Sequence, residues 1–219
     1  MPLRPPADVL TRTPVYRMVH IDCLDTLLRR DALHAPSCSP NDGLPYRGIH
    51  AAQTQVDRGE TPVPCGPRGA IRDYVGFYFG PRSPMLLRLH TGRGVARTPQ
   101  SDIIYLVTHA QTLVGAGLQC VFTDRHSLAR FAAFRERLED LAIMDMPAAY
   151  AEQWNTTAEY PDRQEKKQAE FLVHRVVPWS LIAGIGVLDK NVAVRVERIL
   201  DEHPQRRRPS VAPRRGWYY

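Results

Sequence analysis

The sequence predicts an α+β fold, in which strands and helices share one chain without a regular strand–helix–strand series. Two observations lead to this class. Short β-type and helical segments follow one another in no fixed order, whereas regular alternation would favour a doubly wound parallel sheet. The 219 residues, 43% of them hydrophobic, also have the composition of an ordinary globular protein and show no internal repeat.

The length fits one domain, predicted over residues 14–219, after an extended, proline-containing lead-in at residues 1–13. Val15–Val19 is predicted as the first strand and Leu24–Arg30 as the first helix, because the leucines of that helix share one face. Ala35–Gly69 contains six prolines and has no regular period over most of its length. A short helix is expected at Ala51–Val56. A loop this long is usually functional or disordered.

The rest of the chain is predicted from apolar spacing, with β-branched and aromatic runs read as strands. The predicted strands are Tyr74–Phe79, Met85–Leu89, Ile103–Val107, Gln119–Phe122, Phe171–Val177 and Ile182–Leu188. The predicted helices are His109–Ala116, Leu128–Leu141, Ala148–Trp154 and Asn191–Leu200.

Several function classes are excluded by what the sequence lacks. No apolar run approaches the roughly 20 residues of a membrane span and no secretion signal is present, so the expectation is a cytoplasmic protein without membrane association. The four cysteines form no C-x-x-C pair, which predicts reduced thiols and no metal site. No G-x-x-x-x-G-K-[ST], G-x-G-x-x-G or G-x-S-x-G motif occurs.

The positive charge is concentrated at the C-terminal end. Lysine and arginine outnumber aspartate and glutamate by 29 to 23, a net charge of +6. Five arginines and no acidic residue lie in Pro204–Tyr219, so the rest of the chain carries only +1. A local excess of this kind predicts a patch that faces a polyanion.

The candidate chemical residues stand beside the predicted strands. Arg17 and His20 flank the end of the first strand, Tyr78 lies in an aromatic strand, and His126 follows the strand Gln119–Phe122. Glu170 begins an apolar strand, where a carboxylate costs free energy unless it is paired or used. Each also has a structural interpretation, as an edge, core or cap residue, so these residues alone leave the reaction open.

Four segments, in order, resemble the DarT family of NAD-dependent DNA ADP-ribosyltransferase toxins. They are Val15-Tyr-Arg-Met-Val-His-Ile-Asp, Asp73-Tyr-Val-Gly-Phe-Tyr-Phe-Gly-Pro-Arg-Ser-Pro-Met-Leu, Phe122-Thr-Asp-Arg-His and Lys166-Lys-Gln-Ala-Glu-Phe-Leu-Val. The resemblance covers Val15 to Tyr219, including the terminal Trp-Tyr-Tyr. It implies an ADP-ribosyltransferase fold, a split mixed β-sheet with helices around a central NAD cleft.

The resemblance also implies a set of site residues. Three catalytic residues are expected: Glu170, Arg58 and His126. The residues expected to contact NAD are Arg17, Met18, Val19, His20, Thr26, His34, Arg58, Tyr78 and Met85. The loop Ser39–Glu60 is expected to close over the dinucleotide, and the segment His126–Glu170 to present the DNA base.

The expected chemistry accounts for these residue types. Cleavage of the nicotinamide–ribose bond builds positive charge on the sugar, which a carboxylate on the ribose 2′-hydroxyl stabilises in the transition state. An arginine suits the pyrophosphate. This chain departs from the family pattern in having Arg17 where the family usually has His and Cys23 where it usually has Asn. Arg58 is the only close match to the family's active-site arginine.

The leading hypothesis is therefore transfer of ADP-ribose from NAD to a base, thymine, of single-stranded DNA, by a monomeric toxin paired with a macrodomain antitoxin. A second hypothesis is a metal-independent ribonuclease that uses His126 and Glu170 as acid and base, with Tyr78 and Arg58 as further ligands. A third is a non-catalytic nucleic-acid-binding module that uses the basic C-terminal end.

Overall fold

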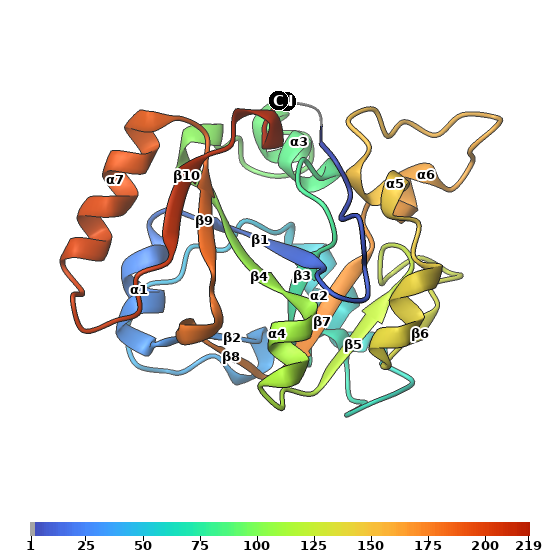
Figure 1. The fold of residues 1–219 in the computed structure, drawn as a ribbon, viewed down its shortest axis with the longest axis horizontal. Helices are drawn as coiled ribbons and strands as arrows, with labels where there is room; N and C mark the ends of the chain where they lie inside the picture. Colours follow the sequence, from blue (N-terminus) through green and yellow to red (C-terminus); the bar gives the residue numbers. More distant parts are fainter. Residues whose placement is uncertain (1–2) are drawn as a thin grey trace.

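The computed structural model describes residues 3–219 and contains two β-sheets with helices around them (Figure 1). The strands are β1 (Pro14–His20), β2 (Ala32–His34), β3 (Tyr74–Tyr78), β4 (Ile103–His109), β5 (Cys120–Thr123), β6 (Phe134–Arg135), β7 (Glu170–His174), β8 (Val176–Pro178), β9 (Gly184–Val187) and β10 (Ser210–Pro213). The α-helices are α1 (Cys23–Arg30), α2 (Ala52–Glu60), α3 (Pro84–Thr91), α4 (Ala110–Gly115), α5 (Met146–Tyr150), α6 (Arg163–Lys166) and α7 (Lys190–Asp201).

The larger sheet has the strand order β10-β9-β4-β1-β3-β7-β5-β6 and is mixed, since β9 and β10 run parallel and the other neighbours antiparallel. The smaller sheet pairs β2 with β8. In the large sheet β1 and β3 pair only at Tyr16 and Tyr78, whereas β1 and β4 pair along seven residues. The sheet is therefore split between β1 and β3, and the predicted α+β class is confirmed.

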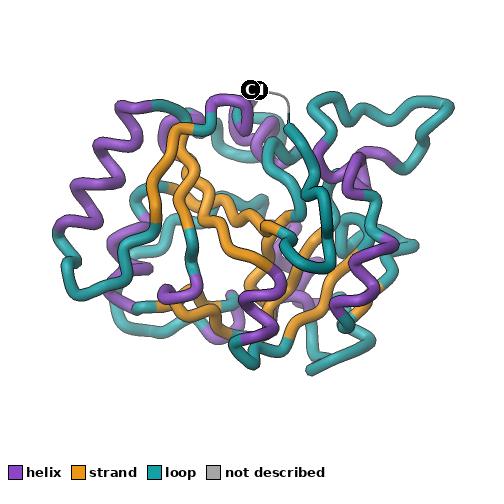
Figure 2. Tube along the Cα trace, in the orientation of Figure 1, coloured by secondary structure: helices purple, strands orange, loops and turns teal. Residues whose placement is uncertain are grey.

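Much of the core lies on these strands, which occupy the middle of the molecule with helices and loops outside them (Figure 2). Helices α7 and α1 lie at the β10–β9 end, and α5 and α6 lie toward the β5–β6 end (Figure 1). A second, smaller cluster packs Tyr74, Val121 and Leu172 with Val63 and Ile71, which fixes part of the long proline-rich loop. Among residues 3–219, no helix has both the length and the apolar character needed to cross a membrane.

The strand predicted at Met85–Leu89 is wrong, because this segment belongs to helix α3. A run of five mostly apolar residues is compatible with a strand or with a helix, and here the residues before the run favour the helix. The Ser83 hydroxyl accepts a hydrogen bond from the backbone N–H of Leu86, which caps the helix N-terminus, and Pro84 occupies its first turn. At the other end Gly92 adopts φ +75°, the left-handed conformation of a C-terminal cap.

The helix predicted at Leu128–Leu141 is also wrong. The segment forms turns, then β6, then a 3-10 helix at Leu138–Ile143. The Asp124 carboxylate accepts from the backbone N–H of Ala133 and so folds the segment back, and β6 pairs with β5. The helix predicted at Ala148–Trp154 is displaced to α5, whose N-terminus is capped by the Asp145 side chain.

Besides β6, strands β2 and β10 were not predicted, and both depend on distant partners. Strand β2 pairs with β8, which is separated from β7 by Arg175 at φ +64°. Strand β10 lies inside the basic C-terminal segment and pairs with β9. The chain then turns back, and Tyr218 donates hydrogen bonds to the carbonyls of Ile103 and Gly186.

Two of the five arginines of that segment form ion pairs within the fold, which changes the interpretation of the charge excess. Arg206 forms an ion pair with Asp31 at 2.9 Å and donates to the carbonyl of Leu28. Arg208 contacts both Glu197 and Asp201 on α7. These contacts neutralise part of the positive charge locally, so the structure gives the terminal arginines a role in attaching β10 to the helices.

Candidate active site

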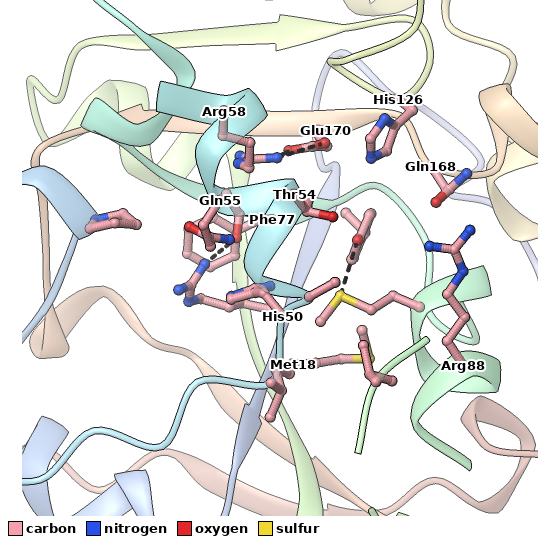
Figure 3. Close-up of a pocket in the computed structure, with 18 of the residues that line it drawn as sticks. Met18, His50, Thr54, Gln55, Arg58, Phe77, Arg88, His126, Gln168 and Glu170 are labelled. Carbon is pink, nitrogen blue, oxygen red and sulfur yellow. Dashed lines mark hydrogen bonds and ion pairs between the residues drawn. The ribbon is translucent and has the colours of Figure 1, made fainter. Parts of the chain in front are cut away.

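A pocket opens where the large sheet splits (Figure 3). Strand β1 contributes Arg17 and Met18, and β3 contributes the segment Gly76–Tyr78. Helix α2 and the loop before it cover one wall, and α3 forms another. Glu170 enters as the first residue of β7. The narrow pairing of β1 with β3 leaves this space, because the two strands pair at Tyr16 and Tyr78 but not at the pocket residues that follow Tyr16 and precede Tyr78.

Glu170 is the central polar group of the pocket and is only 3% exposed. The Nη1 atom of Arg58 lies 3.1 Å and 2.9 Å from its two carboxylate oxygens (Figure 3). The Ser127 hydroxyl donates to Oε1 at 2.8 Å. The backbone N–H of Glu170 donates to the Thr123 hydroxyl, which in turn donates to the carbonyl of Arg125. The carboxylate is therefore fixed from two segments of the chain, α2 and the residues that follow β5, while the end of β5 holds the backbone of Glu170.

The Glu170 carboxylate is held in its ionised form. Burial acts to raise its pKa, but the charge of Arg58, the neighbouring His126 and the Ser127 hydrogen bond together lower the pKa below its ordinary value. A buried carboxylate that stays ionised is a strong electrostatic stabiliser of any positive charge that develops beside it.

The pair of Arg58 and Glu170 depends on a glycine in the neighbouring strand. A Cβ atom at Gly76 would lie 3.3 Å from Nη2 of Arg58 and 3.4 Å from Oε2 of Glu170. Such distances are tighter than those of ordinary packing, so glycine makes room for the two charged groups. A glycine inside an aromatic strand is a sequence signal of this close approach.

Arg17 crosses the split in the sheet. Its Nη1 atom donates to the Gly76 carbonyl at 2.8 Å, and within residues 3–219 its buried Nε has no hydrogen-bond partner. A buried donor without a partner costs free energy unless a ligand supplies the acceptor. An acceptor-rich ligand such as NAD fits this wall.

The opposite part of the pocket combines an aromatic, a thioether and an imidazole. The Tyr78 hydroxyl donates to Sδ of Met85 at 3.7 Å, and burial raises the pKa of Tyr78. Burial lowers the pKa of His126, which Glu170 only partly counteracts, so the imidazole is neutral at pH 7. His50 also lines the pocket, and the protein around its imidazole together with the charges of Arg17 and Arg58 lowers its pKa.

Seven of the residues expected at the site line the pocket: Arg17, Met18, Arg58, Tyr78, Met85, His126 and Glu170. Four expected NAD contacts, Val19, His20, Thr26 and His34, lie outside its wall. Val19 packs in the core, and the Thr26 hydroxyl donates to the Pro45 carbonyl, which ties α1 to the long loop. His20 accepts from the backbone N–H of Asp22, and His34 belongs to β2. Contact of these four with NAD stays a prediction.

The polar residues near the site that the sequence did not single out include Ser127, His50, Thr54, Gln55, Arg88 and Gln168. Ser127 directly follows His126, and Gln168 precedes Glu170 by two residues, so both stood next to recognised motifs. Lys167 was missed as well. It is fully buried, and its Nζ donates to the carbonyls of Pro81 and Ala149 at 2.8 Å and 2.7 Å.

Two solved structures share this fold along the whole chain. One is Thermus sp. 2.9 DarT in complex with ADP-ribosylated ssDNA, with a TM-score of 0.89 and 41% identity, covering 100% of both chains. The other is the same organism's DarT in complex with NAD+, with a TM-score of 0.86 and 40% identity, covering 99% of this chain and 100% of that chain. The fold is thus that of an NAD-dependent ADP-ribosyltransferase.

The particular family follows from the sequence. The family model described as ssDNA thymidine ADP-ribosyltransferase, DarT, matches residues 16–219. The DNA ADP-ribosyl transferase of Thermus sp. (strain 2.9) is 44% identical over 207 residues, which cover 94% of this chain and 96% of that protein. This chain belongs to the DarT family and is a DNA ADP-ribosyltransferase. Among the three functions considered from the sequence, the comparisons support ADP-ribosyl transfer.

Proposed function

We propose that this protein transfers the ADP-ribosyl group of NAD+ to the thymine base of thymidine in single-stranded DNA. The observation that carries the proposal is the buried, ionised Glu170, held by Arg58 and Ser127 at the wall of a pocket formed by the split sheet. A member of the ssDNA thymidine ADP-ribosyltransferase family with this arrangement has the central group that the reaction requires.

Glu170 is assigned the stabilising role. Bound NAD+ supplies the ADP-ribosyl group, whose ribose carbon gains positive charge as the bond to nicotinamide breaks. Glu170 accepts a hydrogen bond from the ribose 2′-hydroxyl, and its negative charge interacts more strongly with the transition state than with the ground state. The low dielectric of a site in which Glu170 is 3% exposed strengthens this interaction.

Arg58 and His126 are assigned to the acceptor step. The base loses a proton as its new bond to the ribose forms, and the proton needs an acceptor. His126 is neutral at pH 7 and borders the pocket, so it is the group to which we assign the proton. Arg58 keeps Glu170 ionised, helps to hold NAD+ and assists removal of the proton by its positive charge.

We propose that NAD+ lies along β1 and the long loop. The unpartnered Nε of Arg17 and the lining residue Met18 support this assignment, and we propose that Tyr78 stacks on nicotinamide. Thr26 acts through its bond to Pro45, which anchors the loop Ser39–Glu60 that we propose closes over the dinucleotide.

The proposal extends to partners. We propose a metal-independent, monomeric enzyme that acts in the cytoplasm and is countered by a macrodomain antitoxin that removes ADP-ribose. Within residues 3–219 no three His, Cys, Asp or Glu side chains come together as a metal site would require. Activity that persists in excess chelator is the expected result, and loss of activity restored by a divalent cation would contradict metal independence.

The test of the reaction is direct. Incubation with NAD+ and a thymidine-containing oligonucleotide should increase the DNA mass by one ADP-ribose. Glu170→Gln should reduce the rate at least a hundredfold while NAD+ binding persists. Glu159→Gln removes an exposed carboxylate of the same type and should have no effect. Absence of an adduct on all four bases, with NAD+ bound, would overturn the proposal, and full activity of Glu170→Gln would remove Glu170 from the mechanism.

A further inference from the structure

Arg88 lines the pocket and is charged, but the proposed mechanism assigns it no role. It lies in the last turn of α3, is exposed to solvent and borders the same cavity as Glu170. Within residues 3–219 its guanidinium forms no ion pair and no hydrogen bond. A guanidinium carries a full charge at every physiological pH and presents five N–H donors, so its binding capacity is unused here.

The other two arginines of the pocket are engaged. Arg58 is bonded to both oxygens of Glu170, and Arg17 donates to the Gly76 carbonyl across the split sheet. Arg88 is thus the pocket arginine whose guanidinium is wholly available to an anion from solution. Forked donors of this kind bind phosphate oxygens in a bidentate manner.

The position of Arg88 points to the acceptor strand. Burial is the main cause of the lowered pKa of His126, the group assigned to take up the acceptor's proton, and the charge of Arg88 adds to it. Arg88 and His126 also line the same pocket. Gln168 lies on the same side of the pocket in Figure 3. A base that reaches His126 therefore brings the backbone phosphates of its strand toward Arg88.

We propose that Arg88 binds a backbone phosphate of single-stranded DNA next to the target thymidine. The inference rests on the proposed function, since it concerns how the same site receives its acceptor. The other source of a phosphate oxygen is the pyrophosphate of NAD+, and the experiment separates the two.

The first measurement compares Arg88→Gln with Arg93→Gln. Arg93 is an exposed arginine just beyond α3 that does not line the pocket, so it is a matched control for lost surface charge. Arg88→Gln should raise KM for an oligothymidylate about five- to tenfold, leave KM for NAD+ unchanged, and reduce the slope of log KM against log salt by about 0.7. Arg93→Gln should change none of these values.

The second measurement locates the phosphate. Oligonucleotides with one target thymidine receive a neutral methylphosphonate at a single linkage, moved stepwise along the strand. One linkage should raise KM with the wild-type enzyme and have no further effect with Arg88→Gln, a non-additivity that general destabilisation does not produce. A raised KM for NAD+ with an unchanged KM for DNA, or additive effects at every linkage, would overturn the inference. If the wild-type enzyme gives no DNA adduct at all, the proposed function fails instead.

Discussion

Replacement of Ser127 by alanine should shift the pH at which the enzyme loses activity in acid. The Ser127 hydroxyl donates to Glu170 Oε1 at 2.8 Å, and a hydrogen bond to a charged group contributes about 1.5–3 kcal/mol. At about 1.4 kcal/mol per pKa unit, its loss raises the pKa of Glu170 by about one to two units. Glu170 works as the carboxylate, so its contribution disappears as pH falls through this pKa, in addition to the loss that protonation of His126 causes. The part of the acid limb that Glu170 sets should therefore lie about one to two pH units higher in Ser127→Ala.

The assay is the initial rate of ADP-ribosylation of an oligothymidylate at constant ionic strength, since thymine does not titrate in the acid range. Near neutral pH the two enzymes should differ by about tenfold at most, because Glu170 is ionised in both and Arg58 remains in place. Ser101→Ala removes a hydroxyl that lies outside the pocket and should leave the profile unchanged. If Ser127→Ala is folded and keeps the wild-type acid limb, the hydroxyl does not hold Glu170 ionised.

Gly76→Ala should reduce turnover about tenfold, because the added methyl group lies 3.3 Å from a guanidinium nitrogen of Arg58. Gly115→Ala meets no atom within 4 Å and should leave turnover unchanged while stabilising its helix by about 0.5–1 kcal/mol, measured by denaturant unfolding. Lys167→Met should lower Tm by leaving two backbone carbonyls without donors. Burial lowers the pKa of Lys167 to about 7, so the wild-type protein binds fewer protons than its unfolded chain above that pH, and its stability advantage over Lys167→Met should grow from pH 7 to pH 9. A Tm deficit that does not vary with pH would contradict this assignment.

The sequence was sufficient for elements whose own residues determine them. The aromatic and β-branched run of β3 and the apolar run of β4 are strands in any packed environment, and the leucines of α1 define one helical face. The segment Leu128–Leu141 shows the limit. Its apolar spacing fits a helix, but the spacing serves two different partners, because Leu128 and Phe134 pack on the smaller cluster whereas Leu141 packs in the large core. Tertiary contacts of this kind override local propensity.

The candidate site likewise contains one residue that the sequence predicts and partners that depend on the tertiary fold. Glu170 was identifiable because a carboxylate at the start of an apolar strand requires an explanation, and the resemblance supplied the rest. Its partners could not be predicted from spacing, since Arg58 precedes it by 112 residues and Ser127 by 43. Only the strand order, which places β7 between β3 and β5, brings these three side chains together.

The distribution of arginines links this geometry to DNA attraction. The C-terminal excess that dominates the net charge is partly consumed by contacts such as Arg206 with Asp31 and Arg208 with the α7 carboxylates. A paired arginine contributes little to counterion release, because its charge is already balanced before DNA arrives. The attraction must therefore come from arginines without acidic partners. At the pocket these are Arg17, which donates to the Gly76 carbonyl, and Arg88, which within residues 3–219 makes no hydrogen bond. Mutation of Arg206 should consequently lower Tm with little effect on the salt dependence of KM for DNA, whereas mutation of Arg88 should do the reverse.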